Sequence, residues 1–195
     1  MQLLREHPWH IDTLLQMSEV ARHHEGDMHK VFGNPPLTYF RAEHSQAADF
    51  VERAIFAFER SFNSTFNITT GSHRLDFDHI ENRSFFLALH RHIINLQRRG
   101  TTRTAFEFAR FLLSLDPGRD PHGALFYLDY LAVRSGQNEW LLSMWDTWTE
   151  IVKTFRPSRS GDEEMVSVEF IPGWWWTRAL AMWNLEISRG DKVTL

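Results

Sequence analysis

The stretch GTTRTAFEFARFLLSLDP at residues 100–117 has the pattern of one helix between two breaks. Gly100 is typical of the end of a preceding helix, and Pro117 cannot continue a helix because it lacks a backbone N–H. Between them, small and apolar residues recur at helical spacing, with Ala105 five residues and Leu112 twelve residues after the glycine. A small residue near the start of a helix lets a neighbouring helix approach closely. The stretch therefore predicts a pair of closely packed helices.

A related but weaker unit follows, in which Gly136 takes the place of Gly100 and Leu141 that of the small residue. The step between the two glycines is 36 residues, close to the period of about 34 residues of a tetratricopeptide repeat. Gly26 and Gly190 are expected to close two more helices at irregular steps. The sequence predicts an all-α fold, an irregular tetratricopeptide-like helical-repeat array (α-solenoid). An ordinary helical bundle with glycine in its loops is the alternative.

Apolar residues three or four positions apart extend the helical pattern along the whole chain. The expected helices are residues 8–26, 47–62, 82–99, 102–115, 121–135, 139–155 and 173–189. Residues 28–43 break the pattern, and Gly33 and Pro36 within them favour a loop, which we expect to lie outside the core. Residues 63–81 are irregular as well, and Asn82 is the expected cap of the helix that follows.

Composition excludes several classes of protein. The chain of 195 residues has a formal net charge of −4 and no cysteine, so disulfides and cysteine-based metal or thiol chemistry are excluded. No apolar stretch approaches the ~18–20 residues of a membrane span, and the N-terminus has no apolar signal-peptide core. We expect a cytoplasmic protein, with the nucleus as a second compartment, and no cofactor, membrane association or small-molecule substrate.

No constellation of residues predicts catalysis or metal binding. His90 and His92 are two residues apart, so they point to different sides of a helix. The metalloprotease, nucleophile-elbow and phosphate-loop motifs do not occur. Asp76, Asp78 and Glu81 cluster in the irregular segment, where carboxylates are more often solvated or capping. A hydrolase with a dispersed site stays as a competing interpretation, which perturbed titratable groups in a deep pocket would support.

Two further groups of side chains invite a binding role. Arg98, Arg99 and Arg103 form a basic patch around the Gly100 turn. Cations at a helix C-terminus are explained by the helix dipole, and a contact with ribosomal RNA or an acidic partner is the alternative. Residues 174–176 are three consecutive tryptophans, which cannot all face one core because successive residues on a helix turn by about 100°.

Three blocks of the sequence together resemble one family. They are HPWHIDTLLQMSEVARHHEGD at 7–27, ADFVERAIFAFERSFNSTFN at 48–67, and RLDFDHIENRSFFLALHRHIINLQRRGTTRTAFEFARFLLSLDPGRDP at 74–121. This combination resembles the transcription factor 25 family, whose fungal members are ribosome quality control complex subunit 1. The resemblance covers most of residues 7–155 and weakens afterwards.

The resemblance implies a non-enzymatic adaptor subunit of the ribosome quality control complex. It implies a role in the ubiquitination and extraction of stalled nascent chains on large ribosomal subunits. The implied partners are the large ribosomal subunit with its stalled chain, a listerin-type ubiquitin ligase and the valosin-containing AAA ATPase. The older family name implies the alternative, a nuclear transcription regulator that acts as a repressor.

The resemblance also suggests a division of the chain. Residues 7–155 are expected to form the family-like helical-repeat region, with a loop insertion at 28–43. A polar linker at 156–169 leads to residues 170–195, the start of a further, truncated helical repeat. Compared with the family's sequence pattern, this chain differs at the insertion and at both of its ends.

The residues of the irregular segment that are most specific to this family form what we call the crossover motif. Its members are Arg74, Leu75, Asp76, Glu81, Asn82 and Arg83. A plain spacer would be rich in Gly, Ser or Pro, so these residues predict either a partner contact or a structural clamp by Asp76 and Arg83. In the structural alternative, Asn82 or Ser84 caps the following helix.

Overall fold

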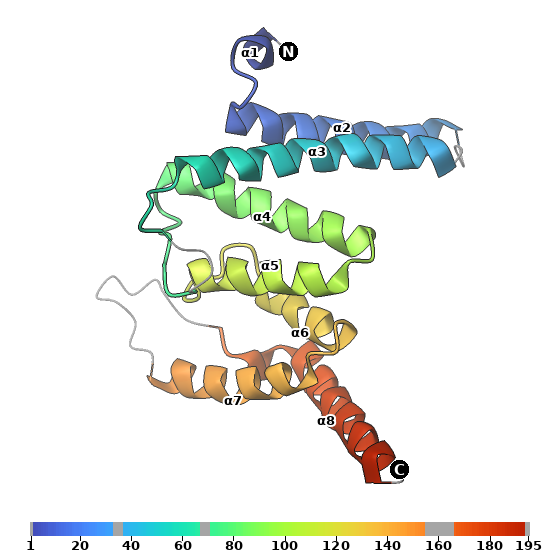
Figure 1. The fold of residues 1–195 in the computed structure, drawn as a ribbon, viewed down its shortest axis with the longest axis vertical. Helices are drawn as coiled ribbons and strands as arrows, with labels where there is room; N and C mark the ends of the chain where they lie inside the picture. Colours follow the sequence, from blue (N-terminus) through green and yellow to red (C-terminus); the bar gives the residue numbers. More distant parts are fainter. Residues whose placement is uncertain (1, 33–36, 67–70, 155–165, 194–195) are drawn as a thin grey trace. The chain divides into compact units, whose positions relative to one another are not determined.

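The computed structural model describes residues 2–32, 37–66, 71–154 and 166–193, and all of its regular elements in these ranges are helices (Figure 1). The all-α prediction is confirmed for this part of the chain. The helices gather into two compact units. Unit 1 comprises Met1–Thr69 and Phe77–Asn95, and unit 2 comprises Thr70–Asp76 and Leu96–Leu195.

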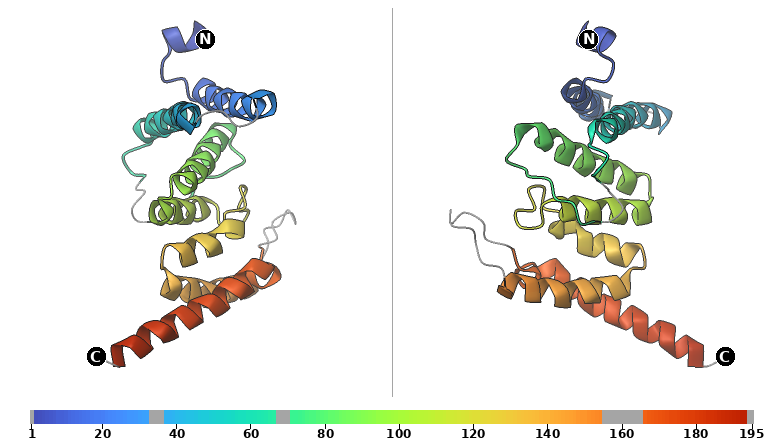
Figure 2. Two further views of the ribbon diagram at one scale, coloured as in Figure 1. Left: turned by 90° about the vertical axis from the view of Figure 1, so that its right-hand side faces the viewer. Right: turned by 60° about the vertical axis from the view of Figure 1, so that its left-hand side comes forward.

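Unit 1 contains α1 (Gln2–Glu6), α2 (Ile11–Phe32), α3 (Leu37–Ser61) and most of α4 (Ile80–Arg98). Helices α2 and α3 lie side by side, as the views of Figures 1 and 2 agree. Their facing residues are apolar and buried, as the 3.6-residue period requires. The buried side chains include Leu14, Leu15, Val51, Ala54, Ile55, Phe58, Phe85, Phe86 and Leu89.

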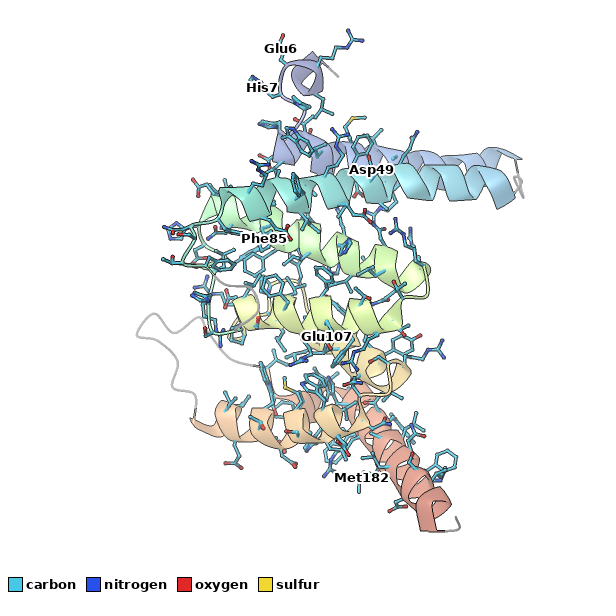
Figure 3. All side chains as sticks on the ribbon, in the orientation of Figure 1. Glu6, His7, Asp49, Phe85, Glu107 and Met182 are labelled. Carbon is cyan, nitrogen blue, oxygen red and sulfur yellow. The ribbon has the colours of Figure 1, made fainter. Side chains whose placement is uncertain are left out.

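An aromatic cluster joins α3 to α4 within unit 1. The ring of Phe85 lies 5.0 Å from that of Phe58 and 4.9 Å from that of Phe62, centroid to centroid. These tilted and edge-on arrangements are the favourable ones for aromatic pairs. Phe85, labelled in Figure 3, is almost completely buried by them.

The predicted stop at Gly26 is wrong, and so is the loop predicted at 28–43. Helix α2 continues through Gly26 to Phe32, and α3 starts at Leu37, ten residues before its predicted start. Residues 33–36 lie outside the described residues. Glycine costs a helix interior only about 1 kcal/mol, and packing between α2 and α3 can exceed that cost.

Unit 2 contains α5 (Thr102–Leu115), α6 (Leu125–Arg134), α7 (Asn138–Thr154), the 3₁₀-helix η2 (Val168–Phe170) and α8 (Pro172–Val193). Helix α6 packs on α5, α7 and α8, and α8 also packs on α7. The buried side chains include Ala105, Phe106, Ala109, Leu112, Leu125, Leu128, Leu131, Leu141, Trp145, Val168, Trp174 and Ala181.

The turns at Gly100 and Gly136 have the same backbone structure. Both glycines have positive φ, 79° and 73°. At the first turn, Gly100 N–H donates to Gln97 O and Thr101 N–H donates to Leu96 O, both at 3.0 Å. This pair of bonds is a Schellman motif, which satisfies the last carbonyls of the helix.

At the second turn, Gly136 N–H donates to Val133 O at 3.1 Å and Gln137 N–H donates to Ala132 O at 2.8 Å. The two bonds connect the same relative positions as those at Gly100. Ala105 and Leu141, each five residues after its glycine, are both completely buried. These two predicted stops, and the close packing at Ala105, are confirmed.

Helix α6 starts at Leu125, four residues later than predicted from Pro121. Asp120 has a positive φ of 41°, which turns the chain away from the helical path. Its carboxylate accepts bonds from Ala124 N–H at 2.7 Å and Leu125 N–H at 2.9 Å. A carboxylate on the first N–H groups of a helix is a stabilising cap, so Asp120 sets the start of α6.

The ends of the other helices also differ in part from prediction. Helix α8 continues through Gly190 to Val193, so the predicted stop at Gly190 is wrong. Helix α4 starts at Ile80, so Asn82 lies in its first turn and is not its cap. Helix α5 matches its prediction at both ends, and α7 differs by one residue at each end.

Candidate partner-binding surfaces

The first half of the crossover motif belongs to unit 2. Leu75 N–H donates to Leu115 O at 2.9 Å, which fixes the segment against the end of α5. The carboxylate of Asp76 lies 3.5 Å from the guanidinium of Arg119. Arg74 donates to Gly71 O at 2.8 Å. Together with the end of α5, these residues line an open groove of about 410 Å³.

The second half of the crossover motif belongs to unit 1. The guanidinium of Arg83 lies 5.3 Å from the ring centre of Phe77 and donates from Nε to Phe77 O at 3.0 Å. Phe77 packs edge-on against Phe86, at 5.3 Å between ring centres. Arg83 therefore holds Phe77 against the first turns of α4.

The remaining members of the crossover motif lie at the start of α4. Glu81 is exposed in the first turn, where its negative charge suits the helix dipole. Asn82 N–H donates to His79 O at 3.0 Å. Ser84 does not cap the helix as the structural alternative supposed, because its hydroxyl donates to Asp12 Oδ1 at 2.6 Å. Ser84 instead joins α4 to α2.

The predicted basic patch is exposed in unit 2. Arg98, Arg99 and Arg103 are all exposed around the Gly100 turn. Arg103 is partly compensated, since its guanidinium lies 3.0 Å from a carboxylate oxygen of Glu107. Glu107, labelled on α5 in Figure 3, also lies 2.9 Å from Arg110. Such exposed pairs contribute little to stability.

A polar network that sequence reasoning missed joins α2 to α4. Arg91 donates to Leu15 O at 2.6 Å and to the Ser18 hydroxyl at 2.9 Å, and its guanidinium lies 2.7 Å from a Glu19 carboxylate oxygen. Glu19 also pairs with Arg22. Burial raises the pKa of Glu19, but the bond from Arg22 and the nearby positive charges outweigh burial and lower it.

This network has a structural role, because it holds α2 against α4. The cavity beside it measures about 20 Å³, room for roughly one water molecule. Burial, followed by the charge of Arg91, lowers the pKa of His90. The only sequence signal for the network was a set of polar residues on otherwise apolar helix faces, which does not identify partners.

A second missed group anchors α8 in unit 2. Trp174 is completely buried, and its Nε1–H donates to Leu125 O at 2.8 Å. Thr177 donates to Asp129 Oδ2 at 3.2 Å. Burial raises the pKa of Asp129, and its hydrogen bonds offset this only in part. An aspartate at 5% exposure is thus held in place between α6 and α8.

The three consecutive tryptophans separate as helical geometry predicts. Trp174 is in the core, whereas Trp175 and Trp176 are 52% and 76% exposed. Among the described residues, no group of three potential ligands could hold a metal ion. The same residues include no helix that is both long and apolar enough to cross a bilayer.

A family model described as transcriptional repressor TCF25 matches residues 1–194. The chain belongs to the TCF25 family. It is 50% identical over 191 residues to "Probable transcription factor claV" from Ampulloclitocybe clavipes, which covers 98% of this chain and 22% of that protein. No solved structure matches the chain.

Other members of the TCF25 family carry a different name. The chain is 37% identical over 146 residues to the human "Ribosome quality control complex subunit TCF25", covering 75% of this chain and 19% of that protein. It is 37% identical over 142 residues to "Ribosome quality control complex subunit 1" of Schizosaccharomyces pombe, covering 73% and 19%. The chain thus spans about a fifth of the length of these relatives. Their names describe complex subunits and a transcription factor, not enzymes.

Proposed function

We propose that this chain is a non-enzymatic adaptor region that serves in the ribosome quality control complex. It would aid the ubiquitination and extraction of stalled nascent chains on large ribosomal subunits. The observation that carries the proposal is the identity of 36–37% to relatives named as subunits of that complex in human, mouse, Dictyostelium discoideum and Schizosaccharomyces pombe. A helical scaffold suits the role, because stacked helices present long surfaces to partners.

The architecture proposed for this role is a tetratricopeptide-like array. The equivalent Schellman turns at Gly100 and Gly136, 36 residues apart, support it. The proposed division keeps residues 7–155 as the helical-repeat region with an insertion at 28–43. Residues 156–169 are the linker, and residues 170–195 start a further repeat.

The crossover motif is the proposed partner contact. Asp76 and Arg83 each hold their own part of the segment by side-chain contacts. Such contacts also keep exposed neighbours in a fixed position, as a binding surface requires. The proposed partners are the large ribosomal subunit with its stalled chain, a listerin-type ubiquitin ligase and the valosin-containing AAA ATPase.

The basic patch of Arg98, Arg99 and Arg103 is the proposed contact with ribosomal RNA. Three exposed guanidinium groups within six residues supply the local charge that the chain as a whole lacks. Neutralising the patch by Arg98→Gln and Arg99→Gln should weaken association with large ribosomal subunits most at low salt, because phosphate contacts are salt-dependent.

The deciding experiment is affinity purification of the full-length protein followed by analysis of ribosome fractions. We expect co-purification with 60S subunits and a ubiquitin ligase, and loss of both when Asp76 and Arg83 are replaced by Ala with unchanged helicity. Glu59→Ala, an exposed charge-removing change on α3 outside the crossover motif, is the control for the two clamping residues. Absence of ribosomal material from the wild-type sample would refute the proposal.

A nuclear transcription regulator is the second candidate. The relative named a probable transcription factor, at 50% identity, favours it. The proposed compartment is the cytoplasm for the first function and the nucleus for the second. Imaging of the tagged full-length protein separates them, since exclusion from the nucleus would refute the second candidate.

A further inference from the structure

A threonine at the Gly100 turn follows two consecutive arginines. The sequence Arg98-Arg99-Gly100-Thr101 places the two cations three and two residues before the threonine hydroxyl. Basophilic protein kinases select substrates with this spacing, because carboxylates in their substrate groove pair with both guanidinium groups. Thr101 is exposed. It therefore combines the recognition pattern of a phosphorylation site with a position on the surface.

The turn places Thr101 at the start of α5. Thr101 is the N-cap residue of α5, yet its side chain makes no capping hydrogen bond there. Its hydroxyl donates instead to Leu96 O at 2.9 Å, the same carbonyl that accepts its backbone N–H. The first N–H groups of a helix have no partners within the helix and carry partial positive charge. The start of α5 therefore lacks the acceptor that a threonine cap ordinarily supplies.

The charges around the hydroxyl favour an anion. Arg98 and Arg99 precede Thr101, Arg103 follows it by two residues, and all three arginines are exposed. Residues 96–106 contain no carboxylate, and the next one along the chain is Glu107, which pairs with Arg103. Arginine binds phosphate through paired, charge-assisted hydrogen bonds, so a phosphate on the hydroxyl would have partners within reach.

We infer that Thr101 is a phosphorylation site of a basophilic kinase, and that its phosphate binds the neighbouring arginines at the start of α5. The kinase transfers the γ-phosphoryl group of ATP. The bond between this group and the β-phosphate oxygen breaks, a bond to Thr101 Oγ1 forms, ADP leaves, and the hydroxyl proton passes to the catalytic aspartate of the kinase. The hydrogen bond to Leu96 O is lost with that proton, which frees the phosphate to turn towards the N–H groups of α5.

The kinase reaches the hydroxyl by opening one turn. Three hydrogen bonds hold Gly100 and Thr101, two of them to Leu96 O and one to Gln97 O. They lie at the end of a helix, where local opening costs far less free energy than global unfolding. The segment can therefore become extended in a kinase groove while the rest of unit 2 stays folded.

The modification would regulate the basic patch, and this part of the inference rests on the proposed contact with ribosomal RNA. A phosphate carries about −1.5 to −2 charges at neutral pH, against the three positive charges of Arg98, Arg99 and Arg103. It therefore cancels at least about half of the charge that attracts RNA. Phosphorylation should weaken RNA binding without any change of fold.

The first test treats the whole purified chain with the catalytic subunit of a basophilic kinase and ATP, and locates the phosphate by mass spectrometry. We expect phosphate on Thr101, at a rate at least about tenfold lower in the double variant Arg98→Gln and Arg99→Gln. Thr104→Val is the matched control, because Thr104 is exposed but has threonines at the two recognition positions. It should leave the rate at Thr101 unchanged, and circular dichroism checks that each variant keeps its helices.

The second test measures whether the arginines bind the phosphate. Phosphorus NMR follows the second pKa of the phosphothreonine, which is ordinarily about 6. Positive neighbours lower this pKa because they favour the doubly charged form. Arg103→Gln, which lies after the recognition pair, should bring the pKa back towards about 6 and leave the rate of phosphorylation unchanged.

Several results would overturn the inference. One is a wild-type chain that stays unmodified at Thr101 while a free peptide of residues 96–104 is phosphorylated, and another is an equal rate in the double arginine variant. A phosphate pKa that Arg103→Gln leaves unchanged would refute the arginine contact.

Binding of a labelled single-stranded RNA of about 12 nucleotides tests the regulation separately. We expect the phosphorylated chain to bind this RNA at least about fivefold more weakly than the unmodified chain. Equal binding by the two forms would refute the regulation. Failure of the unmodified chain to bind would instead refute the proposed RNA contact, while phosphate found on Thr101 still establishes the modification site.

Discussion

Gly100 and Gly26 occupy similar places in the sequence, each after a run of helical periodicity, yet one ends a helix and the other lies inside one. Gly100 has φ of 79° and completes a Schellman motif with Leu96 and Gln97. Gly26 lies within α2, which continues for six more residues alongside α3. The difference teaches that a glycine permits a helix to stop but does not by itself impose a stop.

The largest effect is expected from overfilling the buried position five residues after Gly100. Ala105→Trp places a large side chain at a fully buried site, and we expect a loss of about 3 kcal/mol in the free energy of unfolding. Chemical denaturation measures the loss. Thr104→Trp, at an exposed neighbouring position, is the control. Equal stability of the two variants would mean that α5 has a different buried face.

In unit 1 the corresponding change is the loss of Arg91, which holds α2 at Leu15, Ser18 and Glu19. Arg91→Met should cost about 2 kcal/mol, because charged hydrogen bonds to half-buried partners are lost. Arg22→Met removes only an exposed partner of the same glutamate and should cost about 0.5 kcal/mol. Hydrogen exchange in α2 would show whether the loss is local to that helix.

Substituting the two glycines themselves should give effects of opposite sign. Gly100→Ala forces a side chain into positive φ and should destabilise the chain by about 1 kcal/mol. Space does not limit it, since nothing lies within 4 Å of the added methyl group. Gly26→Ala fills a helix interior and should stabilise by about 0.5–1 kcal/mol. Two shifts in melting temperature of the same sign would refute the comparison.

The smallest effects are those of pH on two carboxylates, one in each unit. The pKa of Glu19 is lowered from 4.5 in the folded state. The stability that ionised Glu19 contributes is therefore present above pH 4.5 and is lost as pH falls through the lowered pKa. The pKa of Asp129 is raised from 3.8, so its contribution is present at low pH and lost as pH rises through the raised pKa.

Stability measured from pH 3 to 7 tests this reasoning. On acidification, wild type should lose stability relative to Glu19→Gln and gain it relative to Asp129→Asn. Identical pH profiles for the two variants would contradict the assigned shifts. The difference in free energy of unfolding between each variant and wild type separates the contribution of that carboxylate from those of the other titrating groups.

The sequence predicted best where local chemistry decides the structure. Both ends of α5 follow from Gly100 and from the Asp116-Pro117 stop, which act within a few residues. The start of α6 was misplaced because the positive φ of Asp120 leaves no trace in the periodicity of its neighbours. The lengths of α2 and α3 were misjudged because Gly26 was read as a stop, whereas α2 continues through it to Phe32 and α3 begins at Leu37.

The same distinction applies to the candidate sites. The separation of the three tryptophans follows from helical geometry and was predictable. The partners of Arg91 and Asp129 were not, because each lies on another helix far along the chain. The partners of Asp76 and Arg83, which are Arg119 and the backbone at Phe77, could likewise not be read from opposite charge alone.

The bonds that join α2 to α4 have a consequence for the order of folding during synthesis. Ser84 and Arg91 reach back across 72 and 76 residues to Asp12 and Leu15. Contacts so distant in sequence form slowly, because a long loop must close first. The bonds that hold α2 to α4 therefore cannot form until α4 has emerged from the ribosome during synthesis. The Gly136 turn of unit 2 involves only neighbouring residues and can form as soon as it is exposed.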